Sequence, residues 1–272
     1  MNPEITNPRS SYSLDRTGPR EKQRLEAQAP FLDPGTIRHV KALGLLSGWH
    51  CAEVGAGAGS IAIWLAERVG RSGRVVATDV DTRFIAHLRR DGLEIRRHDI
   101  LAGPVEANAF DLVHTRLLLS PLADRAKAMN NLVASLRPGG WLLAEEYDLS
   151  TAGSFHPPSA LQSRLNDAVQ SLLRQSGGDP RSGIRLVQDM TAAGLAGVVA
   201  EGRLEVVRLG TPAAESLALR LEPFRDQLLE QGLVTEDEFN RAIEEVQTAG
   251  EGAVHYPPLM VAAWGRRPVR GV

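Results

Sequence analysis

The feature that most constrains this chain is a glycine-rich segment, EVGAGAGS at 53–60, which lies between an apolar run at 50–54 and a helical pattern at 59–69. Glycine lets the backbone turn tightly and leaves room for a ligand against the main chain. The helix that follows offers unpaired N–H groups and the positive end of its dipole. Such a segment predicts the first strand-to-helix turn of an α/β sheet that binds a nucleotide-like ligand.

The chain on both sides of this turn alternates strands with helices. We expect strands at 50–54, 74–79, 93–97, 109–114 and 141–147, and helices at 34–46, 59–69, 82–90 and 124–136. Further helices are expected at 158–175, 182–193, 212–231 and 235–248, with strands at 197–209 and 258–264. This alternation predicts an α/β fold with a doubly wound, mostly parallel seven-stranded sheet and a helical cover.

We expect one domain over residues 1–272. It divides into an N-terminal arm and helix at 1–30, a ligand-binding core at 31–148, a helical cover around a sixth strand at 149–257, and a last strand and tail at 258–272.

Composition excludes several classes of partner. The formal net charge is −2, so the chain lacks the basic excess expected of a nucleic-acid binder. It has one cysteine, Cys51, and no His or Cys spacing typical of a metal site, so no metal is expected. No signal peptide and no apolar run of about 18 residues is found, so we expect no membrane partner and a cytoplasmic location.

Acidic residues follow three of the predicted strands. Glu53 ends the first, Asp79 ends the second and Asp99 follows the third. The carboxyl ends of parallel strands face one crevice, and an acid about 20 residues after a glycine turn suits a ribose. The third position of the dinucleotide pattern, however, falls on Ser60, and no P-loop lysine is present. An acid directly before the turn favours a cationic nucleoside ligand.

Taken in order, these motifs resemble those of class I S-adenosylmethionine-dependent methyltransferases. The resemblance covers about residues 20–150 and includes EVGAGAG, TDVD, HDI, FDLVHTRLLLSPL and LRPGGWLLAEE. Within that family, the sequence is most similar to the small-molecule branch. The resemblance implies S-adenosyl-L-methionine as the cofactor and an antiparallel last strand at 258–264.

The resemblance also implies roles for individual residues. Gly55, Ala56 and Gly57 would lie against the methionine part of the cofactor, and Thr115 would touch it through its backbone. Asp79 would hold the ribose hydroxyls, with Val80 on the adenine. Asp99 and Ile100 would meet the adenine amino group. Tyr12 and Gln28 would close over the cofactor, while Glu53 would orient the turn or meet the cofactor's ammonium through water.

The implied reaction is in-line transfer of a methyl group to O, N or C of a small metabolite. An oxygen nucleophile usually needs a base, for which His114 and His156 are the candidates, with His255 as a further histidine near the last strand. Three alternatives stay open: an enzyme of the same fold with a non-methylation reaction, an NAD-dependent oxidoreductase, and a non-enzymatic cofactor binder. The oligomeric state also stays open, with a homodimer as one possibility.

Overall fold

The computed structural model describes residues 20–151 and 153–269. Its α-helices are α1 (Glu21–Ala42), α2 (Ser60–Val69), α3 (Arg125–Ser135), α4 (Ala160–Gln175), α5 (Ser182–Ala192), α6 (Pro212–Leu221), α7 (Arg225–Glu230) and α8 (Glu236–Thr248). Its strands are β1 (His50–Val54), β2 (Arg74–Asp79), β3 (Leu93–Arg97), β4 (Phe110–Arg116), β5 (Leu136–Asp148), β6 (Phe155–His156), β7 (Ala196–Arg203), β8 (Val207–Arg208), β9 (Val254–His255) and β10 (Leu259–Arg266).

Seven of these strands form one sheet in the order β3-β2-β1-β4-β5-β10-β7. The strands from β3 to β5 pair in parallel, and β10 pairs antiparallel with both β5 and β7. The doubly wound sheet and its antiparallel last strand are therefore confirmed. Because the strand order reverses beside β1, the carboxyl ends of β1 and β4 border the crevice where ligands bind in such sheets.

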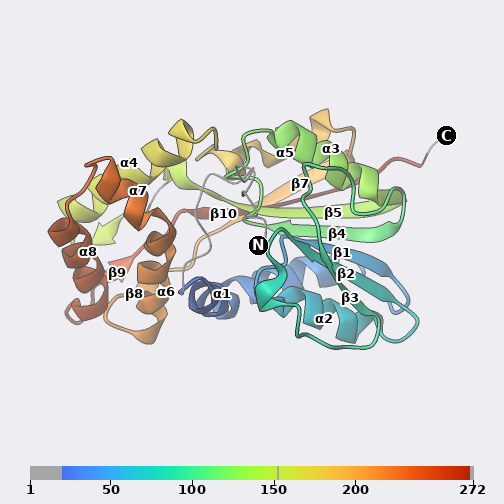
Figure 1. Ribbon diagram of the computed structural model, residues 1–272, viewed down its shortest axis with the longest axis horizontal. Helices are drawn as coiled ribbons and strands as arrows, with labels where there is room; N and C mark the ends of the chain where they lie inside the picture. The colour runs from blue at the N-terminus through green and yellow to red at the C-terminus, as the bar shows by residue number, and fades with distance from the viewer. Residues whose placement is uncertain (1–19, 152, 270–272) are drawn as a thin grey trace, which may run out of the picture.

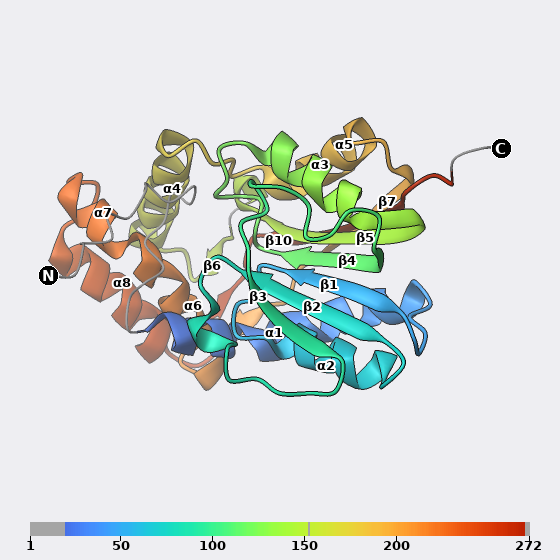
Figure 2. The same cartoon turned by 45° about the vertical axis from the view of Figure 1, so that its right-hand side comes forward.

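Helices cover both faces of this sheet. Figures 1 and 2 show α1 and α2 on one face and α3 and α5 on the other. Each face has its own apolar core, with Leu65, Leu112 and Leu143 under α1 and α2, and Phe110 and Leu132 on the opposite side. A sheet buried on both faces explains why its central strands read as nearly continuous apolar runs.

The remaining helices α4, α6, α7 and α8 gather at one end of the sheet with a small second sheet of order β6-β9-β8. Figure 2 shows the arrowheads of β1, β2 and β4 pointing toward this group, which we call the cover. The cover has an apolar core of its own around Leu165, Leu228 and Phe239. It therefore stands beyond the carboxyl ends of the parallel strands.

Several predicted elements differ in the structure. The first helix runs without a break through Pro30 and Pro34, where the sequence predicted separate segments. The helix expected at 82–90 is a single 3-10 turn, Thr82–Phe84, and the Arg89 guanidinium there donates to two backbone carbonyls. The strand expected at 197–209 divides between the two sheets, as β7 and β8. The helix expected at 212–231 divides at a short turn that contains Pro223.

No helix within the described residues combines the length and apolar character needed to cross a bilayer.

Candidate active site

The glycine segment forms a tight turn that joins β1 to α2. Gly55, Gly57 and Gly59 have φ angles of 76°, 56° and 85°, in the left-handed region that favours glycine. The backbone N–H groups of Gly55 and Ala56 both donate to the carbonyl of Thr78, at 2.8 and 2.9 Å. The turn is thereby tied to the end of β2, and α2 begins directly after it with no side-chain cap on its first turn.

The predicted acids lie along the same sheet edge. Asp79, at the end of β2, accepts hydrogen bonds from the backbone N–H groups of Gly57 and Asp81, each at 3.0 Å. Asp99 follows β3 and accepts one from the N–H of Leu101 at 2.9 Å. Since β1, β2 and β3 are parallel neighbours, the turn and both carboxylates lie at the same edge of the sheet, where sheets of this kind have their ligand crevice.

The other residues that were expected at the cofactor occupy three kinds of position. Val80 is half-buried next to Asp79, whereas Ile100 is buried in the sheet core. Thr115 is also buried, and its hydroxyl donates to the carbonyl of Val54 at 2.9 Å, which ties β4 to the start of the glycine turn. Gln28 lies on α1, and Tyr12 lies outside the described residues.

This crevice suits a cationic ligand that carries a ribose. Carboxylate oxygens accept hydroxyl protons and have lone pairs for more than one donor. Two carboxylates at the edge also favour a positively charged ligand. A Cβ at Gly57 would lie 3.2 Å from Leu25 Cδ2, so the glycine keeps open a space between the turn and α1 that a side chain would fill.

His114 lies in a buried polar network on the face of the sheet that α1 covers. It has no exposed surface, and its Nδ1 lies 2.6 Å from Glu53 Oε2 while its Nε2 lies 3.2 Å from Glu145 Oε2. Thr36 of α1 donates to Glu145, and His39 Nδ1 lies 3.3 Å from the other oxygen of that carboxylate. The network thus joins β1, β4 and β5 to α1. Glu53 engages His114 rather than making a described hydrogen bond to the glycine turn.

In this network, opposite charges stabilise one another and shift the pKa values of His114 and Glu145 toward their ionised forms. Burial alone would lower the pKa of His114, but the carboxylates of Glu53 and Glu145 outweigh it and raise the pKa to about 9. Burial alone would raise the pKa of Glu145, but the hydrogen bond from His114 and the nearby His39 lower it well below its usual range. His114 is therefore protonated at neutral pH with both ring nitrogens engaged, an arrangement that does not suit a base acting on a substrate.

A cavity of about 1190 Å³ opens between the cover and the carboxyl ends of β4 and β5. The sheet contributes Leu117, Glu146 and Tyr147, and α1 contributes Arg24 and Gln28. Leu117 has a φ of 56°, an unusual value for a residue with a side chain and one that often marks a functional site. The cavity lies beside β4, which neighbours β1, the strand that leads into the glycine turn, and Gln28 of α1 lines it.

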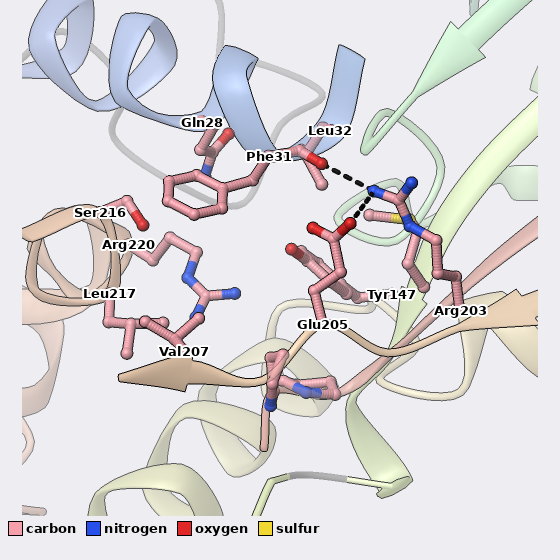
Figure 3. Close-up of a pocket in the computed structure, with 13 residues that line it drawn as sticks. Gln28, Phe31, Leu32, Tyr147, Arg203, Glu205, Val207, Ser216, Leu217 and Arg220 are labelled. Atoms are coloured by element: carbon pink, nitrogen blue, oxygen red, sulfur yellow. Dashed lines mark hydrogen bonds and ion pairs between the residues drawn. The ribbon is translucent and has the colours of Figure 1, made fainter. Parts of the chain in front are cut away.

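The structure separates the two cover histidines. His255 lines the cavity, whereas His156 is exposed and is not among the residues that line it. Sequence reasoning missed Arg220, which lines this cavity and a smaller one beside it, shown in Figure 3. The available signal was a lone cation inside the apolar run of α6, PAAESLALRL.

Comparisons with known proteins agree with this architecture. Residues 52–144 match the model of a family described as methyltransferase domain. Methyltransferase str2 of Strobilurus tenacellus is 29% identical over 133 residues, which cover 48% of this chain and 47% of that protein. The ubiquinone/menaquinone biosynthesis C-methyltransferase UbiE of Hahella chejuensis is 28% identical over 116 residues, 40% of this chain and 47% of that protein. The chain spans about half the length of these curated relatives.

Solved structures extend the likeness to almost the whole chain. Phosphoethanolamine N-methyltransferase 2 of Haemonchus contortus, in complex with phosphomonomethylethanolamine and S-adenosylhomocysteine, superposes with a TM-score of 0.59 at 16% identity, covering 93% of this chain and 59% of that one. The YcgJ protein of Bacillus subtilis superposes with a TM-score of 0.57 at 13% identity, covering 87% and 99%. The fold is therefore the Rossmann-like fold of class I methyltransferases, and the resemblance seen in the sequence is confirmed.

Proposed function

We propose, from the class I methyltransferase fold and the methyltransferase domain at 52–144, that this chain is an S-adenosylmethionine-dependent methyltransferase with a small-molecule acceptor. The observation that carries the proposal is the crevice formed by the glycine turn and Asp79. The two are held together by the hydrogen bond from the Gly57 N–H to the Asp79 carboxylate. The apolar cavity in front of β4 and β5 lies next to it and offers room for an acceptor.

Within that crevice, different residues bind different parts of the cofactor. The turn at Gly55, Ala56 and Gly57 receives the methionine part, while Asp79 accepts from the ribose hydroxyls. Asp99 and Val80 border the adenine, whereas the side chain of Ile100 stays in the sheet core beneath them. Bound S-adenosylmethionine supplies an electrophilic methyl group on a sulfonium sulfur, which a nucleophile aligned in line can take.

The protein's own contribution to the chemistry is alignment. Buried and protonated, His114 serves in this proposal as a positioning residue that holds β1, β4 and β5 in register below the crevice. His156 is exposed, so it stays a candidate base only for a substrate that extends beyond the cavity. An acceptor that enters already ionised or as a free amine needs no base.

The proposal also includes that the methyl acceptor is small and that the protein works in a reducing environment. The cavity is lined mostly by apolar side chains with a few polar groups, as small-ligand sites usually are. Cys51 is buried in β1 and forms no disulfide, and burial raises the pKa of its thiol. A lone unpaired cysteine fits a protein of the reducing cytoplasm.

Calorimetry tests the cofactor part of the proposal. Wild-type protein should bind S-adenosylmethionine and S-adenosylhomocysteine, and Asp79→Ala should weaken both by about 1–3 kcal/mol because buried ribose hydroxyls lose their acceptor. Asp91→Ala is the matched control, since Asp91 pairs with Arg71 on the surface. Absence of binding by wild-type protein would refute the proposal, and an unchanged Asp79→Ala variant would move the site elsewhere.

Two further measurements separate the rival functions. Transfer of a labelled methyl group from S-adenosylmethionine to a small-molecule extract should occur with wild-type protein and, at limiting cofactor, should fall with Asp79→Ala. A titration with NADH followed by nicotinamide fluorescence should give no saturable signal. Saturable NADH binding without methyl transfer would favour the oxidoreductase, and cofactor binding without transfer to any fraction would favour the other two alternatives.

A further inference from the structure

The cavity between sheet and cover is mostly apolar. The cover contributes Leu165, Val169 and Leu173 from α4 and Leu217 and Leu221 from α6, with Phe155 from β6. A lining of this kind favours the hydrocarbon or ring portion of a small molecule over a sugar or a peptide backbone. The polar side chains among these residues then decide which functional group is accepted.

Among the charged groups that line the cavity, Arg220 is the one most in need of an anionic partner. It is partly buried at the end of α6, and no carboxylate of a described residue lies within ion-pair distance of its guanidinium. Its described contact is with the ring of Tyr147, whose centre lies 5.5 Å from the guanidinium carbon. Figure 3, a view of the smaller cavity, shows Arg220 pointing into a space that Tyr147 and Glu205 also face, and both Arg220 and Tyr147 line the larger cavity as well. A desolvated guanidinium favours a carboxylate or a similar anion.

The other charged residues around the cavity do not compete for that anion in the same way. Arg24 is held by two hydrogen bonds to Glu21, at 2.7 and 2.6 Å. Glu146 is buried and accepts the backbone N–H of Leu119 at 2.6 Å. Glu205, near Arg220 in the smaller cavity, pairs with Arg203 at 3.2 Å. Arg220 is thus the cation that a bound anion would meet.

His255 adds a hydrogen-bond acceptor next to Arg220. His255 is buried, with only 6% of the residue exposed. Its ring stacks on that of Phe155, with 4.3 Å between the ring centroids. Its Nδ1 has no hydrogen-bond partner among the described residues. Burial, and then the charge of Arg220, lower the pKa of His255 to about 3, so the ring is neutral. A neutral ring nitrogen of this kind is satisfied by an O–H or N–H of a ligand.

We propose, resting on the methyltransferase function above, that the methyl acceptor is a small apolar acid whose anionic group pairs with Arg220 and whose nearby O–H or N–H donates to His255 Nδ1. Arg220 and His255 act as specificity-determining residues. Both residues line the same cavity, so one ligand can carry the anionic group and the donor together.

Calorimetry with three ten-carbon probes tests this in the presence of saturating S-adenosylhomocysteine. Wild-type protein should bind 3-hydroxydecanoate better than decanoate, and decanoate better than decan-1-ol. Arg220→Met should weaken both acids about tenfold or more and leave decan-1-ol unchanged, because a charged hydrogen bond is lost. Arg220→Lys should recover part of the loss. His255→Phe, which keeps the stack on Phe155, should abolish the advantage of 3-hydroxydecanoate over decanoate.

Controls keep the outcomes distinct. Arg208→Met removes an exposed arginine of the cover and should change no affinity. If His255→Phe fails to fold, His255→Ala, judged by circular dichroism and by S-adenosylhomocysteine binding, replaces it. Equal binding of the three probes, or acids that bind Arg220→Met as well as wild type, overturns the inference while S-adenosylhomocysteine still binds. Failure of S-adenosylhomocysteine to bind wild-type protein instead overturns the methyltransferase proposal.

Discussion

At the scale of single residues, Gly59 faces two separate constraints. Its φ is 85°, and a Cβ there would lie 2.4 Å from Leu88 Cδ1. Gly44 has nearly the same φ, 82°, but no atom within 4 Å of its Cβ position. Alanine at Gly44 should therefore cost about 1–2 kcal/mol of unfolding free energy from the backbone alone. Alanine at Gly59 should cost about 1 kcal/mol more, because Leu88 must move and the fully buried Ile85, whose Cγ2 would lie 3.0 Å away, has little room to do so.

Urea unfolding with matched slopes measures both changes. Equal losses for Gly44→Ala and Gly59→Ala would mean that Leu88 moves aside without cost, and the loop would then be constrained by φ alone. The comparison matters because Gly59 is the residue from which α2 starts below the proposed cofactor crevice.

The sequence predicted where the glycines and the strand-end acids lie in the fold, but not the contacts of every side chain. Glycines between a strand and a helix, and acids at strand ends, carry their positions in their spacing, so Gly55, Gly57, Asp79 and Asp99 lie where expected. The contacts of Glu53 and His114 depend on strand register, which puts them opposite each other on β1 and β4. No local pattern reports that register, and His114 therefore read as a candidate base.

At the scale of elements, α1 is fastened to the sheet by the buried network. Asp33, Thr36 and His39 follow at intervals of three along one face of the helix and meet Arg116 and Glu145. Such side-chain ties help explain why the helix continues through two prolines, each of which removes a backbone hydrogen bond. The spacing is visible in the sequence, but the partners are not, since they lie on strands 80 or more residues away.

The pH dependence of stability should report this fastening. The pKa of His114 is raised from 6.5 to about 9 in the folded protein, so its contribution is complete below about pH 6.5 and is lost as pH rises through 9. The unfolding free energy of wild-type protein should fall over that range by more than that of His114→Asn, which is less stable at pH 6. Urea unfolding at pH 6, 7.5 and 9 measures the difference, with the exposed His87→Asn as control. Parallel pH curves for wild type and His114→Asn would contradict it.

At the scale of the whole molecule, the described residues form two regions with separate apolar cores that share the proposed acceptor cavity. The sheet core contains Leu132, and the cover core contains Leu228, and both side chains are fully buried. Helix α1 lies against both regions, with Arg20 paired to Glu222 and Gln23 hydrogen-bonded to Glu215 of the cover. The alternation of strands and helices predicted the sheet, but the two-residue strands β6, β8 and β9 are too short to leave a period in the sequence.

Separate cores predict that the cover opens without unfolding the sheet, because each region keeps its own buried apolar contacts. Leu228→Ala should speed amide exchange in α4, α7 and α8 and leave β1 and β4 protected, whereas Leu132→Ala, at a cost of about 2–5 kcal/mol, should speed exchange in the sheet. Hydrogen exchange read by mass spectrometry resolves these segments. Because α4 and α6 form one wall of the cavity, an opening confined to the cover would give the acceptor its entry route without disturbing the glycine turn. If both variants accelerate exchange equally in sheet and cover, the molecule opens as one unit and entry must occur through the cavity mouth alone.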